Sequence, residues 1–391
     1  MLPRPLQRPL LAALLSVCAL AVVPRLRLDA QRAGHTTREL GRLVETLSEP
    51  GGFFDTDNLI SNERSYLHVI GALERLGVTG GAYIGVGPAQ NFSYIAQVRP
   101  SVAFIIDIRR DNLLQHLMFK ALFALSQNRA EYLHLLLGRP VPRNVERWAE
   151  RPIDALVAWL DDTPATRASA ESARTAVLDE VRRSGIPLSA DDLATIERFH
   201  TAFIEAGLDL RFTSTGRAPR WYYPTLRQLL TETDLEGRTA SYLASETDFQ
   251  FLKDLQRRNL VIPVTGDLAG SHALASIGRL IAERGLRVSA FYTSNVEDYL
   301  LRDGSFADYS RTVVGLPRDE RSVIIRSYFG GGYPGSHPQA AAGYYSTQLL
   351  QRLDTFAAAI AAGGYRSYRE LVLNDPVPLR GRGGSPSLDH P

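Results

Sequence analysis

Short apolar runs without polar alternation recur along the chain, and segments with helical spacing separate them. Two runs, residues 82–86 and 102–106, lie close together in the first third of the chain, and three more begin at Leu260, Val288 and Ser322. Unbroken apolar runs of this length are typical of parallel strands buried on both faces. Because they alternate with helical patterns, they predict a Rossmann-like α/β fold: a doubly wound, mostly parallel sheet of at least five strands.

The long stretch between the second and third runs has a different pattern. From residue 130 to residue 259 no convincing strand occurs, and apolar positions recur at helical spacing. This predicts a large helical insertion in the sheet domain. The aromatic cluster Trp221-Tyr222-Tyr223-Pro224 within it is typical of packing, with a ligand platform as the alternative. The helices predicted here cover residues 145–160, 169–183, 191–206 and 249–258.

The segments around the sheet complete the predicted organisation. Helices are expected near residues 36–47, and near 62–76 behind Ser61 as N-cap. The polar loop 55–58 either caps and turns the chain or folds over a crevice. Further helices are expected near 113–125 and 271–285. The predicted parts are a first half of the sheet domain (31–129), the insertion (130–259), a second half (260–379) and a disordered tail (380–391).

The first 30 residues are typical of an export signal. Arg4 and Arg8 precede an apolar run, Leu10 to Val23, that is too short to span a bilayer comfortably. We therefore expect an exported, periplasmic or secreted protein, with a retained membrane anchor as the alternative. Cys18 is the only cysteine and lies in this segment, so neither a disulfide nor a thiolate site is expected in the remainder.

Net charge does not favour a nucleic-acid partner. The chain carries +2, but four arginines and one aspartate in the first 30 residues supply +3, so the remainder carries about −1. No long basic stripe occurs, whereas nucleic-acid binding proteins usually carry one. The expected partner is a small-molecule ligand, and a membrane only through the N-terminal segment if it is retained.

The stretch from residue 79 to residue 112 carries the clearest functional signal. It has the pattern strand, glycine turn (Gly85-Val86-Gly87), helix, strand and acidic tip (Asp107). In nucleotide-type sites the turn and the helix N-terminus meet a polar or anionic group, and the carboxylate accepts hydrogen bonds from ribose hydroxyls. The alternative is a glycine turn that serves packing alone. Two polar side chains, Gln90 and Asn91, follow the turn.

Later strand ends add polar groups to the same predicted edge of the sheet. Gly266-Asp267 follows the third run, and Ser294-Asn295-Val296-Glu297 follows the fourth. Because the carboxyl ends of parallel strands lie at one edge, we expect these groups to converge. Asp267 and Glu297 are the acid/base candidates, with helix capping as their alternative role. The predicted binding set is Gly85, Gly87, Gln90, Asn91, Asp107, Arg109, Asp267 and Asn295; of these, Gly87, Asn91, Asp107, Asp267 and Asn295 are expected to line one pocket.

Two other polar residues, His272 and Arg326, lie in or near these predicted strands. His272 follows Asp267 and is more typical of a packed or exposed residue than of a base. Arg326 lies inside the fifth run, where a charged residue is unusual, and this predicts a carboxylate partner for it. No spacing typical of metal ligands occurs, so no metal is expected.

Four segments resemble a bacterial family of uncharacterised exported proteins with a Rossmann-like, methyltransferase-like domain. They are IGVGPAQNFSYI, AFIIDIRRDN, FLKDLQRRNLVIPVTGDLAG and VSAFYTSNVEDYL, and the resemblance covers roughly residues 45–330. More broadly, the order of motifs is similar to class I S-adenosylmethionine-dependent methyltransferases. That resemblance implies S-adenosylmethionine as cofactor, with Gly85 and Gly87 facing its methionine part, Asp107 its ribose and Asp267 its adenine.

The sequence departs from the methyltransferase pattern at two places. It has no acidic residue just before the first glycine strand and no Asn/Asp-Pro-Pro-Tyr tetrapeptide. Three functional interpretations follow. The chain is a methyltransferase held at the cytoplasmic side by an anchor, an exported enzyme that reuses the crevice for another substrate, or an exported binding protein without catalytic activity.

Overall fold

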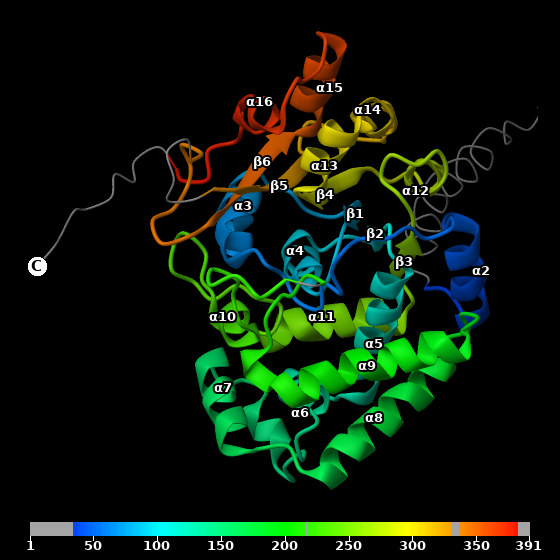
Figure 1. The fold of residues 1–391 in the computed structure, drawn as a ribbon, viewed down its shortest axis with the longest axis vertical. Helices are drawn as coiled ribbons and strands as arrows, with labels where there is room; N and C mark the ends of the chain where they lie inside the picture. The colour runs from blue at the N-terminus through cyan, green and yellow to red at the C-terminus, as the bar shows by residue number, and fades with distance from the viewer. Residues whose placement is uncertain (1–33, 216, 331–335, 382–391) are drawn as a thin grey trace, which may run out of the picture.

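A single six-stranded sheet forms the centre of the molecule. The structure, a computed structural model, describes residues 34–215, 217–330 and 336–381 (Figure 1). The strand order is β3-β2-β1-β4-β5-β6, and all neighbouring pairs are parallel except β5 and β6. The predicted Rossmann-like α/β class is therefore confirmed. The strands are β1 (Ala82–Gly85), β2 (Val102–Asp107), β3 (Val261–Thr265), β4 (Val288–Ser294), β5 (Val323–Phe329) and β6 (Ser346–Arg352).

The five predicted strands occur within one residue of their expected starts, whereas β6 has no counterpart in the prediction. Its sequence, STQLLQR, is polar at most positions, yet its first six residues are buried. Gln348 and Gln351 place their amides in buried hydrogen-bond networks, so polarity there does not mark exposure. The expected signal segment and most of the expected tail lie outside the described residues.

Helices cover both faces of the sheet. In Figure 1, α4 (Gln90–Val98), α5 (Arg110–Leu125) and α11 (Glu246–Arg257) lie below the sheet. Above it lie α12 (Ala273–Glu283), α13 (Val296–Asp303) and α14 (Phe306–Val314). Buried strands between two helical layers explain why the strand sequences read as unbroken apolar runs. The remaining sheet-side helices are α2 (Thr37–Leu47), η1 (Arg64–Val69), α3 (Ile70–Arg75), α15 (Leu353–Ala361) and α16 (Tyr368–Leu373).

The region 130–259 is helical, as predicted, and it packs beneath α5. Its described residues contain no strand beyond three isolated bridges. α8 (Arg167–Arg182) and α9 (Ala190–Ala206) both contact α5, so the insertion extends the lower helical layer. The predicted helix 145–160 is wrong, because Pro152 separates a 3-10 turn from α7. Besides α11, the elements of this region are α6 (Arg129–Leu136), η2 (Val145–Trp148), α7 (Ile153–Asp162), α8 (Arg167–Arg182), α9 (Ala190–Ala206), η3 (Gly207–Asp209) and α10 (Leu226–Thr231).

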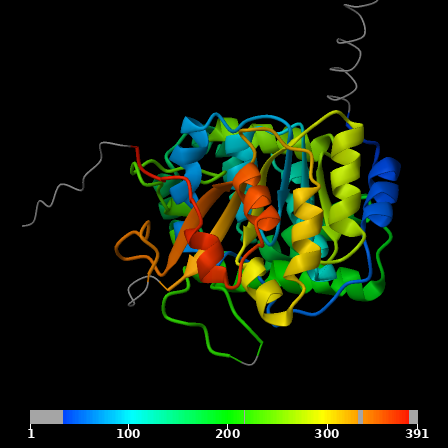
Figure 2. The same ribbon diagram turned by 90° about the horizontal axis from the view of Figure 1, so that it is seen from above.

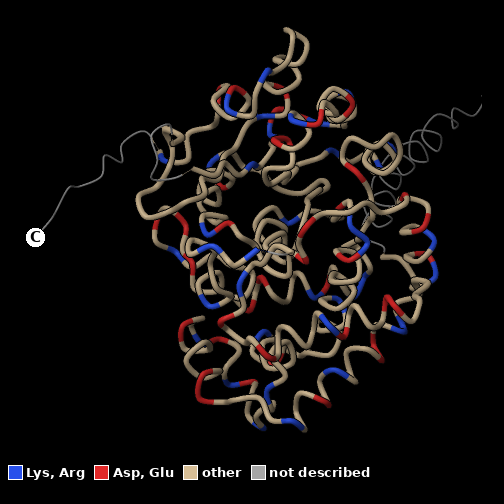
Figure 3. Tube along the Cα trace, in the orientation of Figure 1, with Lys and Arg blue, Asp and Glu red and all other residues tan. Residues whose placement is uncertain are grey.

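Charged side chains are mixed over the described part of the chain. Figure 3 shows acidic and basic positions interspersed along the trace. Among the residues that the structure describes, no helix combines the length and apolar character needed to cross a membrane.

Candidate functional site

A crevice of about 790 Å³ opens at the carboxyl ends of the parallel strands. It lies where the strand order reverses, since β1 pairs with β2 on one side and with β4 on the other. In open α/β sheets this switch point is where ligands bind. Six residues of the predicted set line the crevice together: Gly87, Gln90, Asp107, Arg109, Asp267 and Asn295.

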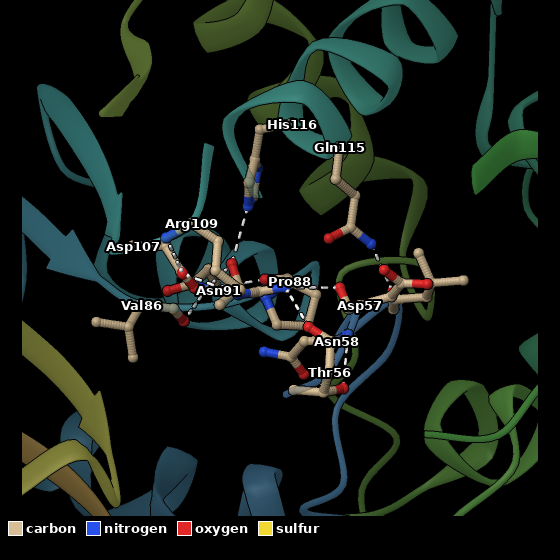
Figure 4. Close-up of polar contacts among 12 residues, drawn as sticks. Thr56, Asp57, Asn58, Val86, Pro88, Asn91, Asp107, Arg109, Gln115 and His116 are labelled. Carbon is tan, nitrogen blue, oxygen red and sulfur yellow. Dashed lines mark hydrogen bonds and ion pairs between the residues drawn. The ribbon is translucent and has the colours of Figure 1, made fainter. Parts of the chain in front are cut away.

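The glycine turn between β1 and α4 is fixed from behind by Asn91. The fully buried Asn91 amide donates to the carbonyl oxygens of Val86 (2.7 Å) and Pro88 (2.8 Å) (Figure 4). Its Oδ1 accepts from the Tyr83 hydroxyl (2.7 Å). Asn91 therefore does not line the crevice, contrary to our expectation, because its side chain satisfies the buried carbonyls of the turn. Gly85 also does not line the crevice.

The two glycines of the turn are needed for different reasons. A methyl group on Gly85 would lie 1.9 Å from Asn91 Oδ1 and 2.7 Å from the Tyr83 hydroxyl oxygen. Gly87 has φ +78°, and a methyl group there would lie 3.2 Å from Asn58 Nδ2. Gly85 therefore permits close packing, whereas Gly87 permits the left-handed turn that faces the crevice.

We expect Gly85→Ala to lower the free energy of unfolding by about 2–5 kcal/mol, since it overpacks the core and displaces a buried amide. Gly87→Ala, the matched variant, is expected to cost about 1–2 kcal/mol through backbone strain alone. Urea unfolding of both variants measures the difference. Equal losses would contradict the separate roles.

Helix α5 supports the turn from its other side. His116 is buried, and its Nε2 lies 2.9 Å from the Gly87 carbonyl oxygen (Figure 4). Burial lowers the pKa of His116 to about 4. The imidazole is therefore neutral near pH 7, and Nε2 carries the proton that it donates to the turn.

Asp107 forms a nearly buried ion pair with Arg109. Its Oδ1 accepts from the backbone N–H (3.0 Å) and Nε (3.1 Å) of Arg109, and its Oδ2 accepts from Nη2 (3.1 Å). The exposed fractions of the two side chains are 12% and 7%. A carboxylate has about four acceptor positions, two on each oxygen. The Arg109 donors occupy both positions on Oδ1 and one on Oδ2. A single position at Oδ2 remains for a ligand.

Arg109 also ties the polar loop 55–58 over the crevice. Its Nη1 donates to the carbonyl oxygens of Thr56 (2.8 Å) and Asp57 (2.9 Å) (Figure 4). Asp55, Thr56 and Asn58 line the crevice. The loop therefore folds over the crevice and forms part of its wall, which is one of the two alternatives predicted for it.

Asp267 lies at the end of β3 and shapes the loop that follows. Its Oδ1 accepts from the backbone N–H of Ala269 (2.9 Å), and its own N–H donates to Glu49 Oε1 (2.8 Å). It does not cap α12, which begins six residues later at Ala273. His272 lies 2.8 Å from the Thr46 carbonyl oxygen through Nε2 and does not line the crevice.

Glu297 lies outside the crevice. It is fully buried and forms an ion pair with Arg326, and it also accepts from the Tyr309 hydroxyl (2.9 Å). The carboxylate partner predicted for Arg326 is therefore Glu297. Glu297 is therefore not an acid/base candidate in the crevice, because its first-turn position in α13 turns the carboxylate toward β5.

A buried cluster that the sequence analysis missed lies in the crevice wall. Glu63 accepts from the Tyr292 hydroxyl (2.6 Å), from Gln348 Nε2 (2.9 Å) and from the Ser294 hydroxyl. Both Glu63 and Ser294 line the crevice. Ser294 precedes Glu297 in the sequence motif, but Glu63 lies 231 positions from Ser294, so no local pattern joins them.

Aromatic side chains and arginines form the outer part of the crevice wall. The loop formed by residues 211–215 and 217–225 projects from the body of the molecule (Figure 2). Tyr222 stacks on Tyr345 with ring centroids 3.7 Å apart, and Tyr223 packs against Phe212. Both tyrosines line the crevice, whereas Trp221 is 83% exposed. The aromatic cluster thus combines packing with a place in the crevice wall.

No group of three or more potential metal ligands occurs within residues 34–215, 217–330 and 336–381. This is compatible with the metal-free site expected from the sequence, which stays a prediction.

The fold and the crevice define a Rossmann-like α/β protein with a ligand-sized site at its switch point. The chain belongs to a family described as a domain of unknown function (DUF7790), whose model matches residues 59–183 and 201–376. The match includes both halves of the sheet and most of the helical insertion. No curated protein matches the chain.

Proposed function

We propose that the crevice binds a nucleoside-type small molecule, with S-adenosylmethionine as the first candidate, and that the protein is a methyltransferase-like enzyme. The observation that carries this proposal is the meeting of the glycine turn and the acidic tip at the switch point. Asp107 ends β2, Gly87 lies in the turn just after the neighbouring strand β1, and both residues line the same crevice. This is the arrangement that nucleotide-binding α/β proteins use.

The residues present fit such a ligand in part. The remaining acceptor position on Asp107 Oδ2 suits one ribose hydroxyl, whereas a grip on both hydroxyls would compete with Arg109. Asp267 and Asn295 offer further polar contacts on either side of the turn. When bound, S-adenosylmethionine supplies an electrophilic methyl group, and the crevice walls would exclude water from it.

Calorimetry with S-adenosylmethionine and its demethylated product tests the proposal. We expect binding with a Kd below about 0.1 mM, roughly −5.5 kcal/mol. Asp107→Asn should weaken it by about 10-fold, the lower end of one hydrogen bond to a charged acceptor. Asp303→Asn is the matched control, because Asp303 lines the crevice but bonds Ser305.

No heat with either ligand at about 0.1 mM wild-type protein would overturn the proposal. Equal effects of the two variants would remove Asp107 from the ligand site. A thermal melt of each variant separates lost binding from lost stability, since Asp107→Asn also weakens the pair with Arg109.

The second candidate is an exported enzyme or binding protein that takes another ligand. The engagement of Asp107 by Arg109 favours it, because a carboxylate with three N–H donors has little capacity left for a diol. Fractionation and N-terminal sequencing of the purified protein distinguish the two. Nucleotide cofactors are cytoplasmic, so a mature chain outside the cytoplasm would favour the second candidate.

A further inference from the structure

Ser294 occupies a strained position at the switch point. It is the last residue of β4, its φ is +53°, and α13 begins two residues later at Val296. A left-handed backbone is uncommon outside glycine and costs roughly 1–3 kcal/mol at a residue such as serine. A sharp turn between a strand and a helix with a strained serine is also the geometry that presents nucleophilic serines at the top of α/β sheets.

The Ser294 hydroxyl faces a carboxylate held in place by other donors. It donates to Glu63 Oε1, while Glu63 Oε2 accepts from the Tyr292 hydroxyl (2.6 Å) and Gln348 Nε2 (2.9 Å). Glu63 is 1% exposed. No ion pair of Glu63 occurs among the described residues, so no cation competes with the serine for this carboxylate. Nucleophile, base and orienting groups are the three parts of an activated serine.

We propose that Ser294 is a catalytic nucleophile toward carboxylic esters and that Glu63 is its general base. The Ser294 hydroxyl proton passes to Glu63 as Oγ forms a bond to the ester carbonyl carbon. When the carbon–alkoxy bond breaks, the leaving alcohol takes that proton from Glu63. Water then hydrolyses the acyl-serine by the same route, with Glu63 taking a proton from water and returning it to Ser294.

The start of α13 suits the negative charge that develops on the carbonyl oxygen. Backbone N–H groups in the first turn of a helix have no partner within the helix, and the helix dipole favours an anion there. The Val296 N–H follows Ser294 by two residues and belongs to this turn, and Val296 lines the crevice. Donors aimed at the developing oxyanion are usually a large contribution to acyl-transfer catalysis.

The crevice wall indicates which esters would bind. Tyr222, Tyr299, Tyr328 and Tyr368 line it, so an ester with an aromatic acyl or alcohol group would find apolar contacts. Aryl esters such as p-nitrophenyl acetate and p-nitrophenyl butyrate are therefore suitable probes. A fluorophosphonate is the second probe, because it reacts preferentially with serines that are activated as nucleophiles.

The experiment combines labelling with hydrolysis, using the full chain. We expect the fluorophosphonate to label wild-type protein once, on the peptide that contains Ser294, as mapped by mass spectrometry. Labelling should be lost in Ser294→Ala, and hydrolysis of the p-nitrophenyl esters should fall about 10²–10⁴-fold in Glu63→Gln. Ser172→Ala is the matched control, because Ser172 is exposed on α8 and does not line the crevice.

Ser294→Gly keeps the test valid if Ser294→Ala folds poorly. Glycine adopts a positive φ without strain, so this variant should be as stable as wild type in a thermal melt and still be unlabelled. Wild-type protein that is not labelled, or is labelled equally in Ser294→Gly, would overturn the proposal. The outcome is independent of calorimetry with S-adenosylmethionine, since neither probe contains a nucleoside.

Discussion

Lowering the pH from 7 toward 4 is expected to unfold the protein, because four buried histidines must take up protons. Burial lowers the pKa of His68, His116, His134 and His200 to about 4 each. In the unfolded chain these imidazoles titrate near 6.5. Between these two values the unfolded state binds more protons, so its free energy falls relative to the native state. Stability is therefore full above about pH 6.5 and is lost as the pH falls toward 4.

The expected loss is large compared with the stability of a typical domain. Each histidine contributes up to about 1.4 kcal/mol per pH unit in this window. Four together reach about 5 kcal/mol per pH unit, against a total of about 5–15 kcal/mol for most native proteins. Urea unfolding followed by circular dichroism at pH 7, 6 and 5 measures the slope.

A single-site variant checks that the histidines are responsible. His200 lies 3.0 Å from the Leu135 carbonyl oxygen through Nε2, and glutamine can donate to the same oxygen. His200→Gln should lower the pH slope by about a quarter while it leaves the protein folded at pH 7. Stability that stays constant from pH 7 to pH 5 would show that these imidazoles are not buried in the neutral form.

The parallel strands could be predicted because the signal for each strand is local in the sequence. Each parallel strand is a short apolar run, and the carboxyl ends of parallel strands lie at one edge, so Asp107, Asp267 and Asn295 had to meet. Strand β6 could not be predicted, because its glutamines are buried through partners far away in the sequence. Gln348, for example, bonds Glu63, which lies 285 positions earlier.

The candidate site was predicted in position but not in the direction of its side chains. Asn91 and Glu297 follow strand ends as the binding residues do, yet Asn91 turns into the glycine turn and Glu297 turns toward Arg326. The direction of each side chain depends on its position around the first turn of its helix. The sequence pattern does not distinguish positions that differ by one residue. Glu63 shows the opposite case, since it comes from the segment before η1 and reaches the crevice only through the tertiary fold.

The second large effect is expected at the buried ion pair. Glu297→Ala should lower the free energy of unfolding by about 3–5 kcal/mol, because it leaves the Arg326 guanidinium as an uncompensated buried charge. The exposed fractions of the two side chains are 0% and 3%. Arg326 Nη2 donates to Glu297 Oε1 (3.0 Å), and its Nη1 donates to Gln351 Oε1 (2.9 Å). Chemical denaturation of wild type and variant measures the loss.

Two further variants distinguish two effects of Glu297. One is the contribution of the Glu297–Arg326 ion pair to stability, and the other is any role of Glu297 in the chemistry of the crevice. The double change Glu297→Leu with Arg326→Met removes both charges and should recover most of the loss, since apolar residues of similar volume often replace a buried ion pair without cost. The exposed pair Arg311–Asp308 is the control, and its removal should cost less than about 1 kcal/mol. A double variant that is stable but cannot hydrolyse the aryl esters would return Glu297 to the acid/base candidates. If that variant keeps wild-type hydrolysis, the crevice chemistry depends on Glu63 and Ser294 without Glu297.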